Sequence, residues 1–338
     1  MSAGENGTIE RALLFDRSAR LRMQFTGPKA AESLAGLVTN DVLALRGGDG
    51  QYACALTPKG RVIADVRILA IADSDGTVNT LLVDSNAAAG VGFSAMIRKY
   101  VNPRLAKYAD VSPSTACLTL AGTRALEVLQ RCGVAAEVAD DLRAGPSFTH
   151  RATSIDDIAV RIARVPDLGD VDAFELHLDR AHCDALLTKL SAAGAERVDD
   201  IEWHRRRVIA GRPEWGLDMD ESTLAQEANM DALQAISYKK GCYTGQETVA
   251  RVHFRGHVNR TLRRVRFSDA VVPSAGAVLN AADSTPVGDA RSSALDDAGQ
   301  LVGIAMVRRV VGDGATLSWA GSDGLAHSLV VVGAPDAD

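Results

Sequence analysis

One stretch of the chain places a thiol among glycines and cations, the residue types that reactive sites need. It runs from Lys239 to Arg260 and contains a single cysteine, Cys242. Lys240 precedes that cysteine and Arg251 follows it. Nearby positive charge stabilises the thiolate, which is the form of cysteine that attacks electrophiles and binds metals. The sequence therefore offers a reactive thiol, with an ordinary structural cysteine in a glycine-rich connection as the alternative.

Glycines recur through the same stretch, at Gly241, Gly245 and Gly256. Because glycine suits tight turns and close approaches, we expect the backbone to turn sharply or to approach a ligand there. The order Lys-Gly-Cys-Tyr-Thr-Gly-Gln-Glu, followed by Ala-Arg and then Phe-Arg-Gly, resembles the signature of the YgfZ family. Members of that family are folate-binding proteins related to the T-protein of glycine cleavage. Residues 37–42 and 57–61 resemble two further sequence elements of the family, more weakly.

The resemblance implies a function. The family supports iron–sulfur enzymes, including radical enzymes that modify tRNA, and depends on the cysteine that corresponds to Cys242. The implied cofactor is tetrahydrofolate or a one-carbon derivative, and the implied partners are folate and iron–sulfur client or assembly proteins. T-proteins place a catalytic aspartate at the hairpin end that Asp65 occupies here, although a surface strand aspartate fits this sequence equally well. A folate-dependent aminomethyltransferase or other one-carbon transferase is therefore the alternative function, and enzymatic activity stays open.

A second candidate site is the run Trp-His-Arg-Arg-Arg at 203–207. The resemblance places a folate-associated tryptophan at Trp203, although a packed core tryptophan is the alternative. A flat pterin gains from aromatic stacking, and arginine such as Arg207 binds carboxylates like those of folate's glutamate tail. Three adjacent guanidiniums cannot all face one way on a helix, so we expect some of them to be solvated. T-proteins carry a pterin-binding glutamate where this chain has Ile209, so a bound folate needs other polar groups to orient it.

The candidate residues divide by role. Those for chemistry are Cys242 and Asp65. Those for holding the cofactor are Trp203, Arg207, Lys240, Tyr243, Gly245, Gln246 and Arg251. No metal site is predicted, because the five cysteines are widely scattered and form no Cys-x-x-Cys pair. The same scatter argues against disulfides and for a reducing compartment.

Charge and composition limit the function classes further. The 338 residues carry a formal net charge of −6 and are 46% hydrophobic, which is typical of a globular protein with two or three lobes. Residues 239–266 are basic, so they can attract polyglutamylated folate, an acidic protein face or RNA. Few aromatic residues accompany that charge, so direct nucleic-acid binding is not expected. No apolar run approaches the roughly 20 residues of a membrane span, and residues 1–8 resemble a loose tail without a signal peptide. We expect a cytoplasmic monomer with no membrane contact.

The elements expected to position these residues form three lobes. Strand patterns occur at 22–26, 52–56, 62–69 and 80–83, with helices after Pro28 and Asn86. A strand–helix–strand–strand–helix order then resembles a ferredoxin-like unit, and short strands after Arg260 indicate an all-β barrel or sandwich. The sequence therefore predicts an α+β, three-lobed fold like that of the T-protein. Its lobes are a folate-binding lobe at 9–111 plus 199–258, a ferredoxin-like lobe at 112–198 and a C-terminal β-barrel at 259–335.

Overall fold

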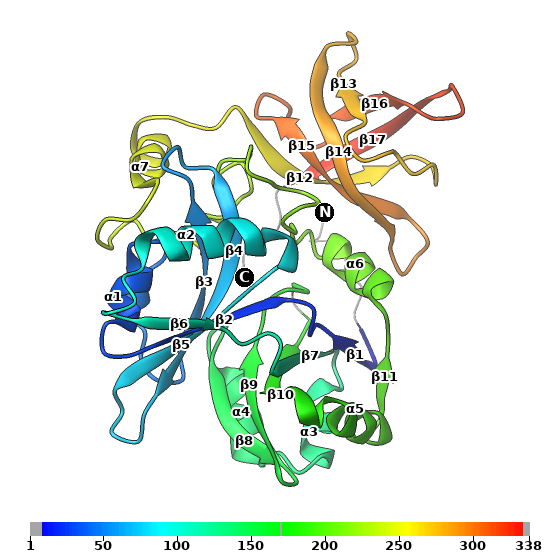
Figure 1. Ribbon diagram of the computed structural model, residues 1–338. Helices are drawn as coiled ribbons and strands as arrows, with labels where there is room; N and C mark the ends of the chain where they lie inside the picture. Colours follow the sequence, from blue (N-terminus) through cyan, green and yellow to red (C-terminus); the bar gives the residue numbers. More distant parts are fainter. Residues whose placement is uncertain (1–8, 170, 334–338) are drawn as a thin grey trace.

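The computed structural model describes residues 9–169 and 171–333 and builds three sheets from them (Figure 1). The predicted loose tail at residues 1–8 lies outside the described residues. The first sheet is antiparallel, in the order β3-β4-β5-β2-β6. Its strands are β2 (Leu21–Thr26), β3 (Gly50–Leu56), β4 (Val62–Ala72), β5 (Val78–Ser85) and β6 (Lys107–Asp110). Helices α1 (Ala30–Ala35) and α2 (Gly90–Tyr100) share a buried core with this sheet.

Alternation along β4 decides which of its side chains reach the functional region. Successive residues of a strand point to opposite faces of the sheet. Ala64, Val66 and Ile68 are fully buried in the core shared with α1 and α2. Asp65 and Arg67 therefore project from the other face, toward the second sheet. The two charged residues of this otherwise apolar strand therefore lie on the face that is turned away from the core shared with α1 and α2.

The second sheet forms the middle lobe, in the order β11-β1-β7-β10-β9-β8. Its strands are β1 (Ala12–Asp16), β7 (Thr115–Ala121), β8 (His150–Ile155), β9 (Ile158–Arg164), β10 (Ala173–Asp179) and β11 (Ala195–Arg197). Helices α3 (Ala125–Arg131), α4 (Ala136–Ala144) and α5 (Cys183–Ala192) share a core with it. The order β11, β7, β10, β9 is that of a ferredoxin-like unit, which confirms the predicted lobe. Two strands are additional: β1, between β11 and β7, and β8, at the edge.

The C-terminal strands close into a barrel, as the sequence predicts. They are β12 (Arg260–Phe267), β13 (Val278–Asn280), β14 (Pro286–Leu295), β15 (Leu301–Arg308), β16 (Thr316–Ala320) and β17 (Ala326–Gly333). Pairing of β12 with both β15 and β17 completes the closure. The mixed α+β architecture is confirmed, whereas the predicted lobe boundaries stay a prediction. Strand β1 joins the sheet of the middle lobe although it precedes the first sheet in sequence.

Two helices connect these lobes. Helix α6 (Asp200–Ile209) begins at Asp199, whose carboxylate accepts hydrogen bonds from the backbone N–H groups of Ile201 and Glu202. It lies between the middle lobe and the barrel, whereas α7 (Gln246–Arg255) lies at the edge of the molecule (Figure 1). Within the described residues, no helix is both long enough and apolar enough to cross a membrane.

Candidate functional site

A pocket lies where β4, the middle lobe and α6 meet, and it is rich in charge. Among the described residues that line it are five arginines and three carboxylates. Three predicted site residues, Asp65, Trp203 and Arg207, line this same pocket. They come from two separate stretches of the chain, β4 and α6, which the fold brings together.

Asp65 is half-buried in the pocket wall, and one of its two oxygens is unused. The hydroxyl of Tyr52 donates to Asp65 Oδ2 at 2.8 Å, whereas Oδ1 is buried without a partner among the described residues. Burial raises the pKa of Asp65, although Arg20, the Tyr52 hydrogen bond and Arg67 act against the rise. The pKa of Tyr52 is raised well above its usual value by burial and by Asp65. The pair therefore presents a carboxyl group that can hold a proton more readily than a solvated aspartate.

Buried ion pairs surround that carboxyl group. Arg20 pairs with Asp84 at 2.5 Å, and Arg67 pairs with Asp167 at 2.8 Å and with Glu175. Burial lowers the pKa of Arg67, but its carboxylate neighbours outweigh burial, so that pKa lies well above its usual value. These charges stay ionised because each has partners, which is the condition for burying a charge at acceptable cost. The sequence did not nominate Arg20 or Arg67, although an arginine inside the apolar β4 was a usable signal.

Trp203 lines the pocket but is already packed. Its side chain is buried, and Phe15 contacts it edge to face with ring centroids 5.2 Å apart. The guanidinium of Arg17 lies over the indole, 4.2 Å from its centroid. A ligand in the pocket therefore meets a tryptophan that is held on two sides.

Arg207 is bound on every side by protein groups. Its Nη1 donates to Asp218 at 2.6 Å, its Nε lies 2.9 Å from Glu214, and its Nη2 donates to Ser292 of the barrel at 2.8 Å. The remaining donors meet the backbone oxygen of Arg212 and the ring of His204. The predicted bidentate grip on a glutamate tail is not what this geometry provides. Arg207 instead joins α6 to the barrel and to the segment that follows α6.

The expectation that some guanidiniums of α6 are solvated holds only in part, for Arg205. Arg206 is buried and pairs with Glu202 at 2.6 Å and with Asp297 at 2.8 Å. Arg205 is partly buried and also pairs with Asp297, at 2.5 Å. Arg206 and Arg207 are buried because α6 is covered from two sides. Asp297 belongs to the barrel loop after β14, so the barrel supplies the second cover. Ile209 is buried too and does not line the pocket.

The motif cysteine lies outside this pocket. Of the five cysteines, all of which the structure describes, only Cys242 is exposed. The predicted cofactor ligands Lys240, Tyr243, Gly245, Gln246 and Arg251 do not line the pocket either. Their predicted role in cofactor binding stays a prediction. The structure therefore separates the nominated residues into two regions.

Lys240 is anchored to α1 rather than to the thiol. Its Nζ donates to the backbone oxygens of Ala35 at 2.5 Å and Val38 at 2.7 Å, and it lies 5.0 Å from the centroid of the Tyr243 ring. Burial lowers the pKa of Lys240 to about 8. Carbonyls at the end of a helix lack partners within the helix, so a lysine there satisfies them. The charge of Lys240 thus fastens the motif to the first sheet's lobe.

The close approach expected at the motif glycines occurs at Gly245 and involves the protein's own backbone. Gly245 has φ +86°, and a Cβ there would lie 2.6 Å from the oxygen of Thr57. Gly241 and Gly256 show neither a positive φ nor a neighbour closer than ordinary contact. The ring of Tyr243 is buried in a cluster that includes Cys54, the residue paired with Asp65 across β3 and β4. A shared core thus connects the motif to the pocket wall.

Beyond Gly245, helix α7 carries an exposed surface that combines cations with aromatic rings. Arg251, Phe254 and Arg255 share one face of the helix, and Phe254 is 67% exposed. Lys239 is also exposed, in the loop that contains Cys242. None of the three cations forms an ion pair with the residues that the structure describes. We call Lys239, Cys242, Arg251, Phe254 and Arg255 the motif face.

Comparisons with known proteins agree with this architecture. Residues 4–240 match the family model described as "GCVT N-terminal domain". A mitochondrial iron–sulfur cluster assembly factor homologue of Mycosarcoma maydis is 30% identical over 261 residues, with 74% of this chain and 56% of that protein covered. The chain thus spans little more than half of that relative. The tRNA-modifying protein YgfZ of Yersinia pestis (strain Pestoides F) is 28% identical over 252 residues, with 74% of this chain and 70% of that protein covered.

A solved structure shares the fold across nearly the whole chain. It is the glycine cleavage system aminomethyltransferase T from Bartonella henselae, with a TM-score of 0.83, 21% identity, and coverage of 97% of this chain and 87% of that one. The resemblance inferred from the motif and the predicted three-lobed fold are both confirmed.

Proposed function

We propose a function from one premise: the chain belongs to the GCVT N-terminal domain family. It acts as a tetrahydrofolate-binding accessory protein for the assembly or repair of iron–sulfur clusters in client enzymes, including radical enzymes that modify tRNA. The names of two relatives support the roles in cluster assembly and in tRNA modification, since one is a cluster assembly factor and the other a tRNA-modifying protein. The observation that carries the proposal is the exposure of Cys242 outside the pocket, where a partner protein can reach it.

The pocket suits a flat heterocycle with polar edges, such as the pterin of tetrahydrofolate. Asp65 Oδ1 and Arg17 Nε are both buried, and neither has a hydrogen-bond partner among the described residues. Unpaired buried polar atoms are rare in native proteins, so a ligand that pairs with them is favoured. Tyr52 and Phe148 lie parallel, with ring centroids 6.3 Å apart, and supply apolar wall. In this proposal Asp65 and Arg17 bind the polar edge, taking the place of the glutamate that Ile209 replaces.

Tetrahydrofolate, when bound, supplies a carrier for one-carbon units. The chain's own contribution is to orient that carrier and to place a proton at Asp65. Burial keeps the carboxyl proton available to a nitrogen in the pocket, because it raises the pKa of Asp65 by disfavouring the ionised form. Tyr52 holds the carboxyl group in one orientation through the hydrogen bond to Oδ2.

The motif face suits docking of an acidic protein surface. Its cations are exposed and form no ion pair with described residues, whereas the chain as a whole carries a net charge of −6. A local basic surface on an acidic protein steers acidic partners to one place. Phe254 adds apolar contact area beside those charges. In this proposal an iron–sulfur client or assembly protein docks here and meets the thiol of Cys242.

A folate-dependent aminomethyltransferase is the second candidate function. Asp65, with a buried oxygen that lacks a partner among the described residues, favours it, because a transferase needs a proton-handling group beside the folate. That candidate gives Cys242 no role, since Cys242 does not line the pocket.

Genetic complementation separates the two candidates. We would delete the gene in its host, measure an iron–sulfur enzyme and a cluster-dependent tRNA modification, and restore wild type, Cys242→Ala, Asp65→Asn or the control Cys183→Ala. The accessory function predicts that wild type and Cys183→Ala rescue both assays and that Cys242→Ala does not. Full rescue by Cys242→Ala, together with aminomethyl turnover that Asp65→Asn abolishes, would establish the transferase. Normal assays after deletion would overturn the accessory function.

Folate binding needs its own measurement. Trp203 lines the pocket, so titration of the purified protein with tetrahydrofolate under anaerobic, reducing conditions should change its indole fluorescence. We expect Asp65→Asn to weaken binding by about 1–3 kcal/mol, the usual effect of losing one hydrogen bond to a charged or buried group. Cys242→Ala should bind as tightly as wild type. Equal weakening by both variants would contradict the separation of pocket and motif face.

A further inference from the structure

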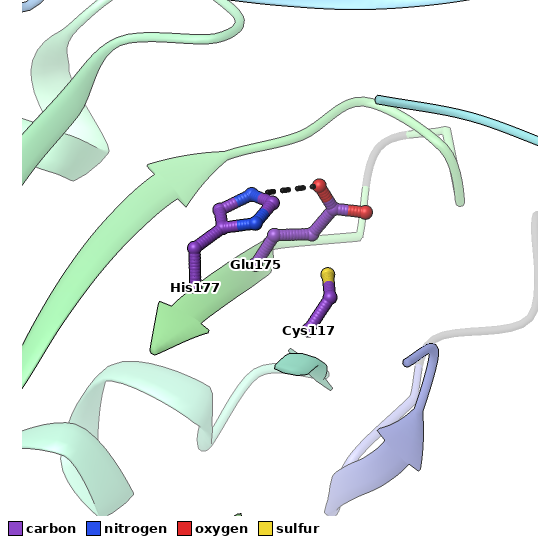
Figure 2. A group of neighbouring side chains, drawn as sticks. All are labelled: Cys117, Glu175 and His177. Carbon is purple, nitrogen blue, oxygen red and sulfur yellow. Dashed lines mark ion pairs between the residues drawn. The ribbon is translucent and has the colours of Figure 1, made fainter. Parts of the chain in front are cut away.

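Three side chains with metal-ligating atoms meet on one face of the second sheet (Figure 2). Cys117 of β7 and His177 of β10 are directly paired across the antiparallel ladder, and Glu175 lies two residues before His177. Directly opposed residues, and residues two apart on one strand, share a face of the sheet. One ligand atom from each of the three lies within 4.8 Å of the other two, and all three residues are buried. We propose that Cys117, Glu175 and His177 form a binding site for a divalent transition-metal ion of the zinc class.

Buried polar atoms without hydrogen-bond partners lie beside these three side chains, and they support the proposal that a metal ion binds there. His177 is 8% exposed, and its Nδ1 has no partner among the described residues. Its Nε2 has only a long contact of 3.5 Å with Glu175 Oε2, which Figure 2 shows as a dashed line. Thr119, paired with Glu175 across the ladder, also has a buried Oγ1 that lacks a partner among the described residues. Native proteins leave few buried polar atoms unpaired, so two beside three potential ligands indicate that a partner belongs there.

The donor set selects the class of ion. A thiolate and an imidazole favour zinc and similar transition metals over magnesium or calcium, which prefer oxygen ligands. Three protein ligands leave a fourth position open for water, because zinc is usually four-coordinate. A thiolate and a carboxylate together cancel the charge of a divalent cation, so the occupied site is neutral overall. The distances between the three ligand atoms, which are up to 4.8 Å, shorten on binding, since zinc lies about 2.0–2.3 Å from each ligand atom.

Binding requires one proton to leave. Burial, with Glu175 and Asp84 nearby, raises the pKa of the Cys117 thiol well above its usual value. The thiol is therefore protonated in the metal-free protein. Metal binding breaks its S–H bond, forms a metal–sulfur bond and releases the proton to solvent. Glu175 is already ionised, because the cation of Arg67 outweighs its burial and holds its pKa below the usual value.

The site is coupled to the pocket through one carboxylate. Glu175 Oε1 pairs with Arg67, whereas Oε2 faces His177. A metal bound at Oε2 therefore shares its carboxylate with a pocket-lining arginine. Groups bonded to a metal's ligands orient those ligands and are oriented by them in turn. We infer that an occupied site fixes Arg67 in the pocket wall. The proposal departs from the sequence's prediction of no metal site, and it does not depend on the identity of the pocket's ligand.

The test uses the full chain, stripped with a chelator and titrated with Zn²⁺ or Co²⁺. We expect about one ion per chain, and with Co²⁺ a thiolate-to-metal charge-transfer band together with the visible bands of a four-coordinate ion. Cys117→Ser and His177→Gln should each weaken binding at least about tenfold. The matched controls are Cys132→Ser, a buried cysteine of the same lobe, and Cys242→Ser, the exposed thiol. Both should bind like wild type.

A second readout covers the case in which Cys117→Ser does not fold. A ligand that binds only the folded state raises its melting temperature. Zinc should therefore raise the melting temperature of wild type and of Cys242→Ser but not that of His177→Gln. Absence of stoichiometric binding to wild type would overturn the proposal. So would a Co²⁺ thiolate band that Cys242→Ser removes and Cys117→Ser leaves intact.

Discussion

The pocket and the motif face treat their charges in opposite ways. In the pocket, arginines are buried and meet carboxylates or other acceptors of the protein, as Arg207 and Arg67 do. On the motif face, Arg251 and Arg255 are exposed and form no ion pair with described residues. Both regions are rich in arginine, so composition alone does not distinguish them. The burial and ion pairing of their arginines distinguish the two regions.

That difference separates positioning from recognition. A paired buried charge is costly to disturb and holds neighbouring elements in place, whereas an exposed charge contributes little to stability. The pocket arginines therefore set the geometry around Asp65, and the motif-face arginines remain available to a partner. The exposed thiol of Cys242 belongs to the second region, so the role proposed for it does not require a contribution to the pocket.

The largest expected effect comes from breaking the pairing of Arg207. Arg207→Ala leaves Asp218, which is fully buried, without its cation, and leaves Glu214 only the more distant Arg17 at 3.9 Å. Removing one partner of a buried ion pair typically costs about 3–5 kcal/mol, because the other charge stays buried and unpaired. We expect the free energy of unfolding in urea to fall by that amount.

Arg251→Ala is the matched control for this loss. Its guanidinium is exposed and forms no ion pair among the described residues, so its unfolding free energy should stay within about 0.5 kcal/mol of wild type. Similar losses for the two variants would remove the distinction between the regions.

The next effect tests whether the motif's glycine is structural. Gly245→Ala places a Cβ 2.6 Å from the oxygen of Thr57 and forces alanine to adopt φ +86°. We expect a loss of about 1–3 kcal/mol of unfolding free energy, since strained backbone of this kind costs that much. Gly241→Ala is the control, because a Cβ at that position would meet no described atom within 4 Å and the φ of Gly241 is not positive. Equal stability of Gly245→Ala and wild type would show that the loop can move away from the 57–60 turn.

Some of this arrangement was predictable from the sequence. The alternation of β4 and the turn at 57–60 define a hairpin, and period 2 alone places Asp65 and Arg67 on one face. The short strands after Arg260 likewise predict the barrel. Local patterns were sufficient for these elements, but they missed the β8–β9 hairpin although its two strands adjoin in sequence.

Other parts depend on long-range contacts that no local pattern encodes. Strand β1 pairs with β7 and β11, which lie far along the chain, and its short apolar run gave no strand signal. Arg206 of α6 is buried because the barrel loop at Asp297 covers it, which helical spacing cannot reveal. Cys117 and His177 meet only after β7 and β10 pair. Side-chain clusters therefore required the structure, whereas the β3–β4 hairpin did not.

A smaller effect concerns the carboxyl group in the pocket and its pH dependence. Burial raises the pKa of Asp65, so between the ordinary aspartate value and the raised one the folded chain holds a proton that the unfolded chain has lost. The free energy of unfolding from this group therefore falls as pH rises through that window. Asp65→Asn lacks the group, so as pH rises above about 4, the ordinary aspartate value, its stability should improve relative to wild type.

Tyr52→Phe sharpens this measurement. The Tyr52 hydrogen bond lowers the pKa of Asp65, so its loss should extend the fall in unfolding free energy to higher pH. Parallel pH profiles for Asp65→Asn and wild type would mean that Asp65 is solvated and that the pocket is not closed around it.

The smallest effect compares two adjacent lysines, one in each kind of environment. Burial lowers the pKa of Lys240 to about 8 from the usual 10.5, whereas Lys239 is exposed on the motif face. Between those two pKa values the unfolded chain binds more protons than the folded chain, so the free energy of unfolding should rise with pH there. Lys240→Met should lose that rise, and Lys239→Met should keep it, when urea unfolding is measured at intervals from about pH 7.5 to pH 10. A rise that persists in Lys240→Met would show that the ammonium group is solvated, and Lys240 would then belong with the exposed cations of the motif face.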